Sequence, residues 1–185
     1  MAARRWRLLT LATLIAAAGI LVSAQRARMP QRANGAGPTT FNADIDGDRR
    51  PDVCRLEARP KGAMLLCTLA RNGRDVRSEV LDPGYPEGRA FVDFDGDGKQ
   101  DYCRVIGTAF PNSFAACTLS LGERFAPQPI VSASLDWGYP ESREWKDVNG
   151  DGKADFCRVV GNNRESLACT FSTGTGFGRT VVNPR

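Results

Sequence analysis

The stretch Asp93-Phe-Asp95-Gly-Asp97-Gly-Lys-Gln-Asp101 carries four carboxylates within nine residues. Carboxylates this close repel one another unless a cation neutralises them. The alternate spacing of Asp93, Asp95 and Asp97, with small residues between them, favours a tight loop around one hard cation. Because the ligands offered are oxygens and the chain has no histidine, calcium is favoured over zinc or copper.

The same pattern occurs twice more along the chain. One copy is Asp147-Val-Asn-Gly-Asp-Gly-Lys-Ala-Asp155, and an altered copy is Asp44-Ile-Asp-Gly-Asp-Arg-Arg-Pro-Asp52. The three loops start 49 and 54 residues apart, which is typical of propeller blades and too long for helical solenoids. The sequence therefore predicts a repeat protein.

Each acidic loop is followed by two short segments rich in β-branched and aromatic residues, with one cysteine in each segment and a turn between them. In every repeat the midpoint between the two cysteines falls inside the turn, so the cysteines face each other across an antiparallel hairpin. Six cysteines behind a secretory leader indicate disulfides. The predicted pairs are Cys54–Cys67, Cys103–Cys117 and Cys157–Cys169.

Further strands are predicted on both sides of each hairpin, and no segment has the pattern of an amphipathic helix. The strands after the hairpins are expected at 75–81, 130–135 and 180–182, and those leading into the acidic loops at 39–43, 89–92 and 143–146. The expected fold is all-β, with three tandem, propeller-blade-like antiparallel repeats of ~50 residues. A closed three-fold, β-trefoil-like arrangement is the alternative.

The N-terminus has the form of a secretory signal. Arg4, Arg5 and Arg7 precede an uncharged, mostly apolar run at 8–22, and small residues suited to cleavage follow. We expect a signal peptide at 1–24, a flexible linker at 25–40, and repeats at approximately 41–90, 91–144 and 145–185. The protein should then be secreted or extracellular, with the periplasm or cell envelope as alternatives and no membrane span after cleavage. An uncleaved anchor stays open.

Charge argues against nucleic acid as a partner. The net charge of +4 includes three arginines in the leader and three in the linker, which leaves −2 on the repeats. Acidic groups cluster there while basic groups are scattered, whereas nucleic-acid-binding domains carry a basic face.

The acidic loop followed by a short strand resembles the FG-GAP repeat of integrin-α-type β-propellers and of related secreted bacterial proteins with FG-GAP or VCBS-like repeats. The resemblance covers about 41–185, and a cysteine pair in each repeat is not a general feature of that family. It implies that the first, third, fifth and ninth loop positions bind calcium through side chains and the seventh through its carbonyl. The implied ligands of up to three ions are Asp44, Asp46, Asp48, Arg50 and Asp52; Asp93, Asp95, Asp97, Lys99 and Asp101; and Asp147, Asn149, Asp151, Lys153 and Asp155.

Two positions modify this expectation. Arg49 stands where the other loops have Gly98 and Gly152, and a sharp turn there favours glycine. The first site should therefore be the weakest. The twelfth positions are arginines within strand patterns, which excludes a helical EF-hand.

The residues favour a binding module over an enzyme. Without histidine there is neither a Ser-His triad nor a His-ligated zinc. Aromatic and acidic residues gather around two Gly-Tyr-Pro-Glu segments, where they could bind a glycan or a cell-surface protein, although packing between blades is the favoured role for each aromatic. The candidate ligand-binding residues are Tyr85, Glu87, Trp137, Tyr139, Glu141 and Trp145. A protein-adhesion module and, less favoured, an orphan extracellular hydrolase are the alternatives.

Three blades do not close a propeller. A homodimer could form a six-bladed ring, with the ends at 39–43 and 180–182 completing each other's blades.

Overall fold

The structure, a computed structural model, describes residues 39–184. The chain divides into two units, 1–31 and 32–185, and every described residue belongs to the second. The expected signal peptide and almost all of the expected linker lie outside the described residues. Within the described part, no helix has the length and apolarity needed to cross a membrane.

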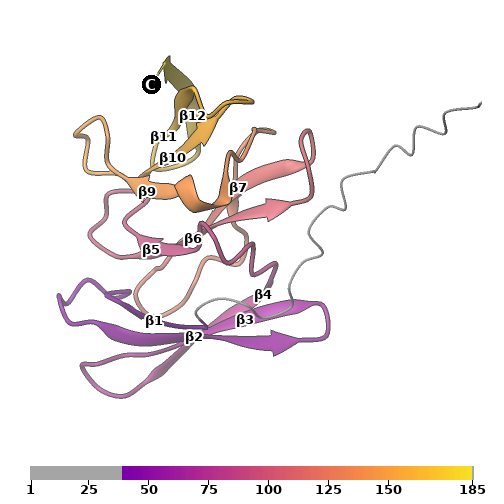
Figure 1. The fold of residues 1–185 in the computed structure, drawn as a ribbon. Coiled ribbons are helices and arrows are strands. Elements are labelled where there is room, and N and C mark those ends of the chain that lie inside the picture. The colour runs from indigo at the N-terminus through magenta and orange to yellow at the C-terminus, as the bar shows by residue number, and fades with distance from the viewer. Residues whose placement is uncertain (1–38, 185) are drawn as a thin grey trace, which may run out of the picture. The chain divides into compact units, whose positions relative to one another are not determined.

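The described chain forms three four-stranded antiparallel sheets in tandem, each with its strands in sequence order (Figure 1). The first sheet contains β1 (Thr40–Ala43), β2 (Asp52–Arg59), β3 (Gly62–Thr68) and β4 (Asp75–Leu81). The second contains β5 (Ala90–Val92), β6 (Asp101–Gly107), β7 (Ser113–Thr118) and β8 (Ile130–Val131). The third contains β9 (Glu144–Lys146), β10 (Asp155–Val160), β11 (Ser166–Ser172) and β12 (Phe177–Pro184), preceded by a short 3-10 turn, η1 (Pro140–Ser142). The all-β prediction is confirmed, and the trefoil-like alternative is wrong because the sheets are separate.

The disulfide prediction is confirmed in all three repeats. Cys54 is the register partner of Cys67, Cys103 of Cys117 and Cys157 of Cys169. Each pair is bonded, with Cα atoms 3.9 to 4.1 Å apart. The close approach follows from their positions directly opposite each other in the hairpin.

Two outer strands differ in length from their predictions. β8 ends at Val131, and the next residues follow β7 through irregular pairing. The Ser132 and Leu135 amides donate to the Ala115 and Ser113 carbonyls at 2.9 and 3.0 Å. The Ala115 amide donates to Ser132 Oγ at 3.0 Å, and Ser113 Oγ donates to the Leu135 carbonyl at 2.6 Å. β12 is longer than predicted, extending to Pro184.

The first and last strands of the repeat array lie at the outer edges of their sheets. β1 is an outer strand of the complete first sheet, and β12 is an outer strand of the complete third sheet. Each of these sheets thus has four strands from one chain. The two-chain ring, with these segments completing each other's blades, stays a prediction.

The hydrophobic core lies between consecutive sheets. Ile45, Leu65 and Val76 of the first repeat pack with Tyr102 of β6 and Phe125, all buried. The second core contains, in the same way, Phe94, Val105, Ala115, Trp145 and Phe156. Each repeat is thus stabilised by its neighbour, as in other repeat proteins.

The outer face of the first sheet carries a row of charged residues on β2. Cys54 points toward the core, so alternation places Arg55, Glu57 and Arg59 on the opposite face. Glu57 forms ion pairs with Arg55 at 3.1 Å and with Arg59 at 2.7 Å. A polar outer face favours the solubility of a terminal repeat.

Candidate metal centres

The first aspartate of each acidic loop organises the loop from within. Asp93 Oδ1 accepts hydrogen bonds from the amides of Gly96 and Asp97, and Oδ2 accepts one from Gly98, at 2.7 to 3.1 Å. Asp44 and Asp147 each accept the corresponding three bonds. The backbone therefore forms a nest of N–H groups around each carboxylate.

The aspartate at the ninth position of each loop joins that loop to its hairpin. Asp101 is fully buried; its Oδ2 accepts the Phe94 amide at 3.0 Å and its Oδ1 accepts the Ser120 amide at 2.7 Å. Asp52 and Asp155 make the equivalent pairs of bonds. Burial raises the pKa of Asp101 to about 7, with the nearby carboxylates adding to the rise and the two amides opposing it.

Two of the three loops bring carboxylates close enough to share an ion. Oxygens of Asp44, Asp46 and Asp48 lie within 4.8 Å of one another, and so do oxygens of Asp93, Asp95 and Asp101. Burial and neighbouring carboxylates raise the pKa of Asp95, so a cation there would relieve repulsion. This all-oxygen donor set fits calcium.

In the third loop an amide takes the place of the second carboxylate. Asn149 Oδ1 accepts the Asp151 amide at 2.9 Å, as Asp95 Oδ1 accepts the Asp97 amide at 3.2 Å. Asn149 therefore has the same orientation in its loop as Asp95 has in the second loop. The carbonyls of Arg50, Lys99 and Lys153 remain predicted ligands.

The first loop keeps its conformation despite Arg49. Arg49 has φ +66°, close to the +84° of Gly98 and +83° of Gly152. Its amide still donates to Asp44 Oδ2 at 2.7 Å. A side chain in this region costs about 1 to 2 kcal/mol, so the substitution strains the loop without opening it.

Arg71 is a loop-one feature that the sequence analysis missed. Its Nε lies 2.8 Å from the buried Oδ2 of Asp46. The positive charge of Arg71 therefore already neutralises part of the charge on that carboxylate. Repeat alignment places Leu121 and Thr173 at the equivalent positions, and comparing these three residues could have identified Arg71. The charge of Arg71 gives a second reason for expecting the weakest calcium binding at loop one.

We expect Arg71→Ala to tighten calcium binding at loop one by roughly two- to five-fold, because an ion pair of this kind is worth about 0.5 to 1 kcal/mol. The Gly47 amide, followed by NMR during a calcium titration, reports on this loop. Arg74→Ala is the matched control, since Arg74 pairs with Glu123 at 3.2 Å. Equal affinities in the two variants would show that Arg71 does not compete with the ion.

The three loops are joined in series. Asp44 and Gln100 exchange two hydrogen bonds of 2.8 Å, and the Ala154 amide donates to the Asp93 carbonyl at 2.8 Å. Ser172 Oγ also donates to the Phe94 carbonyl at 2.6 Å. An ion that orders one loop would therefore restrain the next.

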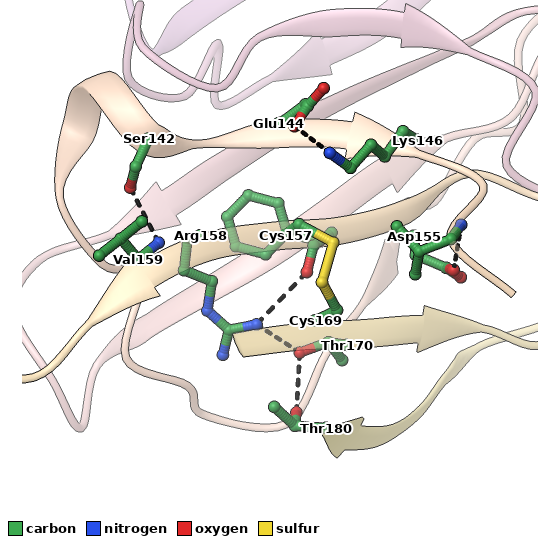
Figure 2. Close-up of a disulfide and its surroundings, with 12 residues drawn as sticks. Ser142, Glu144, Lys146, Asp155, Cys157, Arg158, Val159, Cys169, Thr170 and Thr180 are labelled. Atoms are coloured by element: carbon green, nitrogen blue, oxygen red, sulfur yellow. Dashed lines mark hydrogen bonds and ion pairs between the residues drawn. A yellow bond between two sulfur atoms is a disulfide. The ribbon is translucent and has the colours of Figure 1, made fainter. Parts of the chain in front are cut away.

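Buried arginines hold the segments that contain Gly-Tyr-Pro-Glu. Figure 2 shows Arg158 beside the Cys157–Cys169 disulfide, where its Nη1 donates to Thr170 Oγ1 at 2.6 Å. Its Nε donates to the Asp136 carbonyl at 2.7 Å. Arg104 makes the equivalent bonds to Asp82 and Thr118 in the second repeat. Both guanidinium groups thus fix the start of the segment that precedes their own repeat.

The candidate aromatic residues are engaged within the fold. Trp145 is buried, and its Nε1 donates to the Gly88 carbonyl at 2.8 Å. Tyr85 packs edge-on against Trp137 with ring centroids 4.8 Å apart. Tyr139 donates to the Gly161 carbonyl at 2.9 Å. These contacts support the packing role that the sequence analysis favoured for each aromatic.

The two candidate acids lie on the surface. Glu87 and Glu141 are exposed, and Glu141 forms an ion pair with Arg164. Of the six candidate ligand-binding residues, these two are the most accessible, while Tyr85, Trp137 and Tyr139 are half-buried.

Comparison with known proteins gives one partial likeness. No family model matches the chain. An NAD(+)–arginine ADP-ribosyltransferase of Vibrio cholerae, Chelt, is 34% identical over 122 residues, which is 66% of this chain and 18% of that enzyme. The chain therefore spans less than a fifth of the curated relative that it matches.

Proposed function

We propose that this protein is a secreted, calcium-binding repeat module that binds carbohydrate or cell-surface ligands and has no catalytic activity. The observation that carries the calcium assignment is the convergence of three carboxylates in each of the first two loops. The three disulfides support secretion, because such bonds persist in oxidising compartments.

Calcium has a structural role in this proposal. Each loop reverses the chain between two strands, and its first and ninth aspartates are already held by backbone amides. An ion would neutralise the remaining mutual repulsion and lock the reversal. Extracellular modules bind calcium with a Kd on the order of 10⁻⁴ to 10⁻³ M, so the sites would be occupied at extracellular calcium levels.

Adding about 2 mM calcium should stabilise the protein by roughly 1 kcal/mol for each occupied site, because an ion that binds only the folded state shifts the folding equilibrium. Thermal unfolding with calcium and with chelator measures this difference. Asp95→Asn should reduce the shift, whereas Asp75→Asn, on the exposed side of β4 next to Arg77, should keep it. An identical unfolding temperature with calcium and with chelator would overturn the calcium assignment.

A binding role is favoured over catalysis by the available chemistry. The chain has no histidine, and all six cysteines are in disulfides. The likeness to the Vibrio cholerae enzyme is confined to 18% of that protein, so it does not carry that enzyme's activity to this chain.

The ligand class is open to a direct test. A glycan array probed in calcium and again in chelator should give signals that the chelator removes if the ligand is carbohydrate. Absence of every glycan signal, together with capture of one defined cell-surface protein, would favour the protein-adhesion alternative. Hydrolysis of an arrayed glycan would instead support the hydrolase.

A further inference from the structure

A groove of about 550 Å³ lies beside the first sheet. One wall is β2, which contributes Leu56 and Ala58, and the other is the turn that carries Pro83 and Tyr85. Thr39, the first described residue, also lines it. The described part of the chain therefore begins at the edge of this groove.

The equivalent place beside the other two sheets is filled by a turn of the chain. In the second repeat the Tyr85 amide donates to the Val105 carbonyl of β6 at 2.9 Å, and in the third the Tyr139 amide donates to the Val159 carbonyl of β10 at 3.0 Å. Both acceptors lie two residues after the first cysteine of their hairpin, and so does Leu56 in the first. The groove therefore lies at the place in the first repeat where the second and third repeats each have a turn.

The occupied positions require glycine. Gly84 and Gly138 have φ of +71° and +63°. A Cβ atom at these residues would lie 2.7 Å from the Val105 carbonyl oxygen and 2.4 Å from the Val159 carbonyl oxygen. Because real Cβ atoms do not approach backbone so closely, any other residue would push the turn off the strand.

Successive turns also contact each other. Trp137 of the later turn packs on Tyr85 of the earlier one, and Arg143 Nη1 donates to the Glu87 carbonyl at 3.1 Å. The residues of the earlier turn that correspond to Trp137 and Arg143 are Pro83 and Arg89, and both line the groove. The groove therefore presents both surfaces that hold a turn elsewhere in the fold.

The sequence contains a similar segment at the same offset from the first acidic loop. Each filled turn starts 11 residues before its acidic loop, at Asp82 and Asp136. The same offset from Asp44 leads to Ala33-Asn-Gly-Ala-Gly-Pro38, in which Gly35 falls at the position of Gly84 and Gly138. We propose that residues 33–38 dock in the groove as a third copy of this turn.

In this arrangement the Ala36 amide donates to the Leu56 carbonyl, and the Ala36 methyl occupies part of the space that a tyrosine ring fills in the other repeats. Direct covalent linkage through Thr39 gives the segment an effective concentration in the millimolar range. The tether thereby compensates for the missing tyrosine ring.

Amide hydrogen exchange of the full chain tests the docking directly. The Ala36 amide should exchange at least ~10-fold more slowly than amides at 26–29, because a hydrogen-bonded amide must open before it exchanges. Gly35→Val should remove that protection, whereas the matched control Gly37→Val should keep it. Exchange of Ala36 at the rate of the 26–29 amides would overturn the proposal, and protection that grows with protein concentration would do the same by showing that a second copy fills the groove.

Gly35→Val could lose protection simply because it misfolds, so a second variant is chosen that should increase stability. Ala36→Tyr should raise the unfolding temperature by a few degrees, because the ring would fill the groove beside Pro83 as Trp137 packs on Tyr85. Asn34→Tyr is its control and should leave the temperature unchanged. Equal unfolding temperatures for the two tyrosine variants would count against docking in this register.

Discussion

Replacing Arg104 with methionine is expected to lower the free energy of unfolding by roughly 2 to 4 kcal/mol. Arg104 is 1% exposed and donates to the Asp82 carbonyl at 2.6 Å and to Thr118 Oγ1 at 2.9 Å. Methionine keeps most of the side-chain volume but cannot donate either bond. The Asp82 carbonyl then loses its charged donor where the turn meets the sheet. Chemical denaturation monitored by tryptophan fluorescence measures the change.

Arg55→Met is the matched control for this prediction. Arg55 occupies the same position after its acidic loop, yet its side chain is 45% exposed and contacts Glu57 on the outer face of the first sheet. Its replacement should change the free energy of unfolding by no more than about 0.5 kcal/mol, as exposed substitutions usually do. Similar losses in the two variants would mean that burial and anchoring do not distinguish Arg104.

Removing the central disulfide by the double substitution Cys103→Ala and Cys117→Ala should cost about 3 kcal/mol, because the bridge restricts the unfolded chain across a separation of 14 residues. Both cysteines are fully buried between the second and third sheets, so lost packing adds to the cost. Denaturant unfolding under non-reducing conditions measures the difference.

The double serine variant at the same two positions separates these contributions. It removes the same cross-link but leaves hydroxyl groups in an apolar core, so it should be less stable than the alanine pair. A loss below about 1 kcal/mol in the alanine pair would show that the hairpin's own strand pairing already restricts the chain.

Calcium binding and docking of residues 33–38 both act on the first repeat, through different elements. The first depends on the loop that starts at Asp44, and the second on the carbonyl of Leu56 in β2. Chelator should therefore lower the stability of the chain without abolishing protection of the Ala36 amide, so the two proposals can fail independently.

Local patterns predicted most of the elements correctly. The hairpins follow from period-two alternation and from turns centred between cysteines, and both properties depend on residues close in the sequence. The same locality explains why the three disulfide pairs could be predicted. The outer strands were less predictable: beyond Val131 the contacts with β7 continue through a mixture of backbone bonds and serine hydroxyl bonds.

In the acidic loops, too, contacts between residues close in the sequence were predictable, whereas contacts between distant residues were not. Spacing placed the four carboxylates of the second loop near one another, and the structure brings oxygens of three of them, Asp93, Asp95 and Asp101, within 4.8 Å of one another. The contact between Arg71 and Asp46 spans two elements and depends on how the end of the first hairpin lies over the loop. No local pattern reports such a contact, although repeat alignment marks Arg71 as different.

The sequence by itself determined the three repeats, their acidic loops, their hairpins and their disulfides, because each depends on residues that are close together in the sequence. Only the tertiary structure decided which copies of one motif are buried. Arg55, Arg104 and Arg158 follow their loops at identical spacing, yet Arg104 and Arg158 are buried and Arg55 is exposed. Arg104 and Arg158 lie on the face of their sheet that packs against the preceding repeat, where each meets the carbonyl of a preceding turn. Arg55 lies on the same face of the first sheet, which no earlier described sheet covers. Burial is a property of neighbours in space, and those neighbours come from the adjacent repeat.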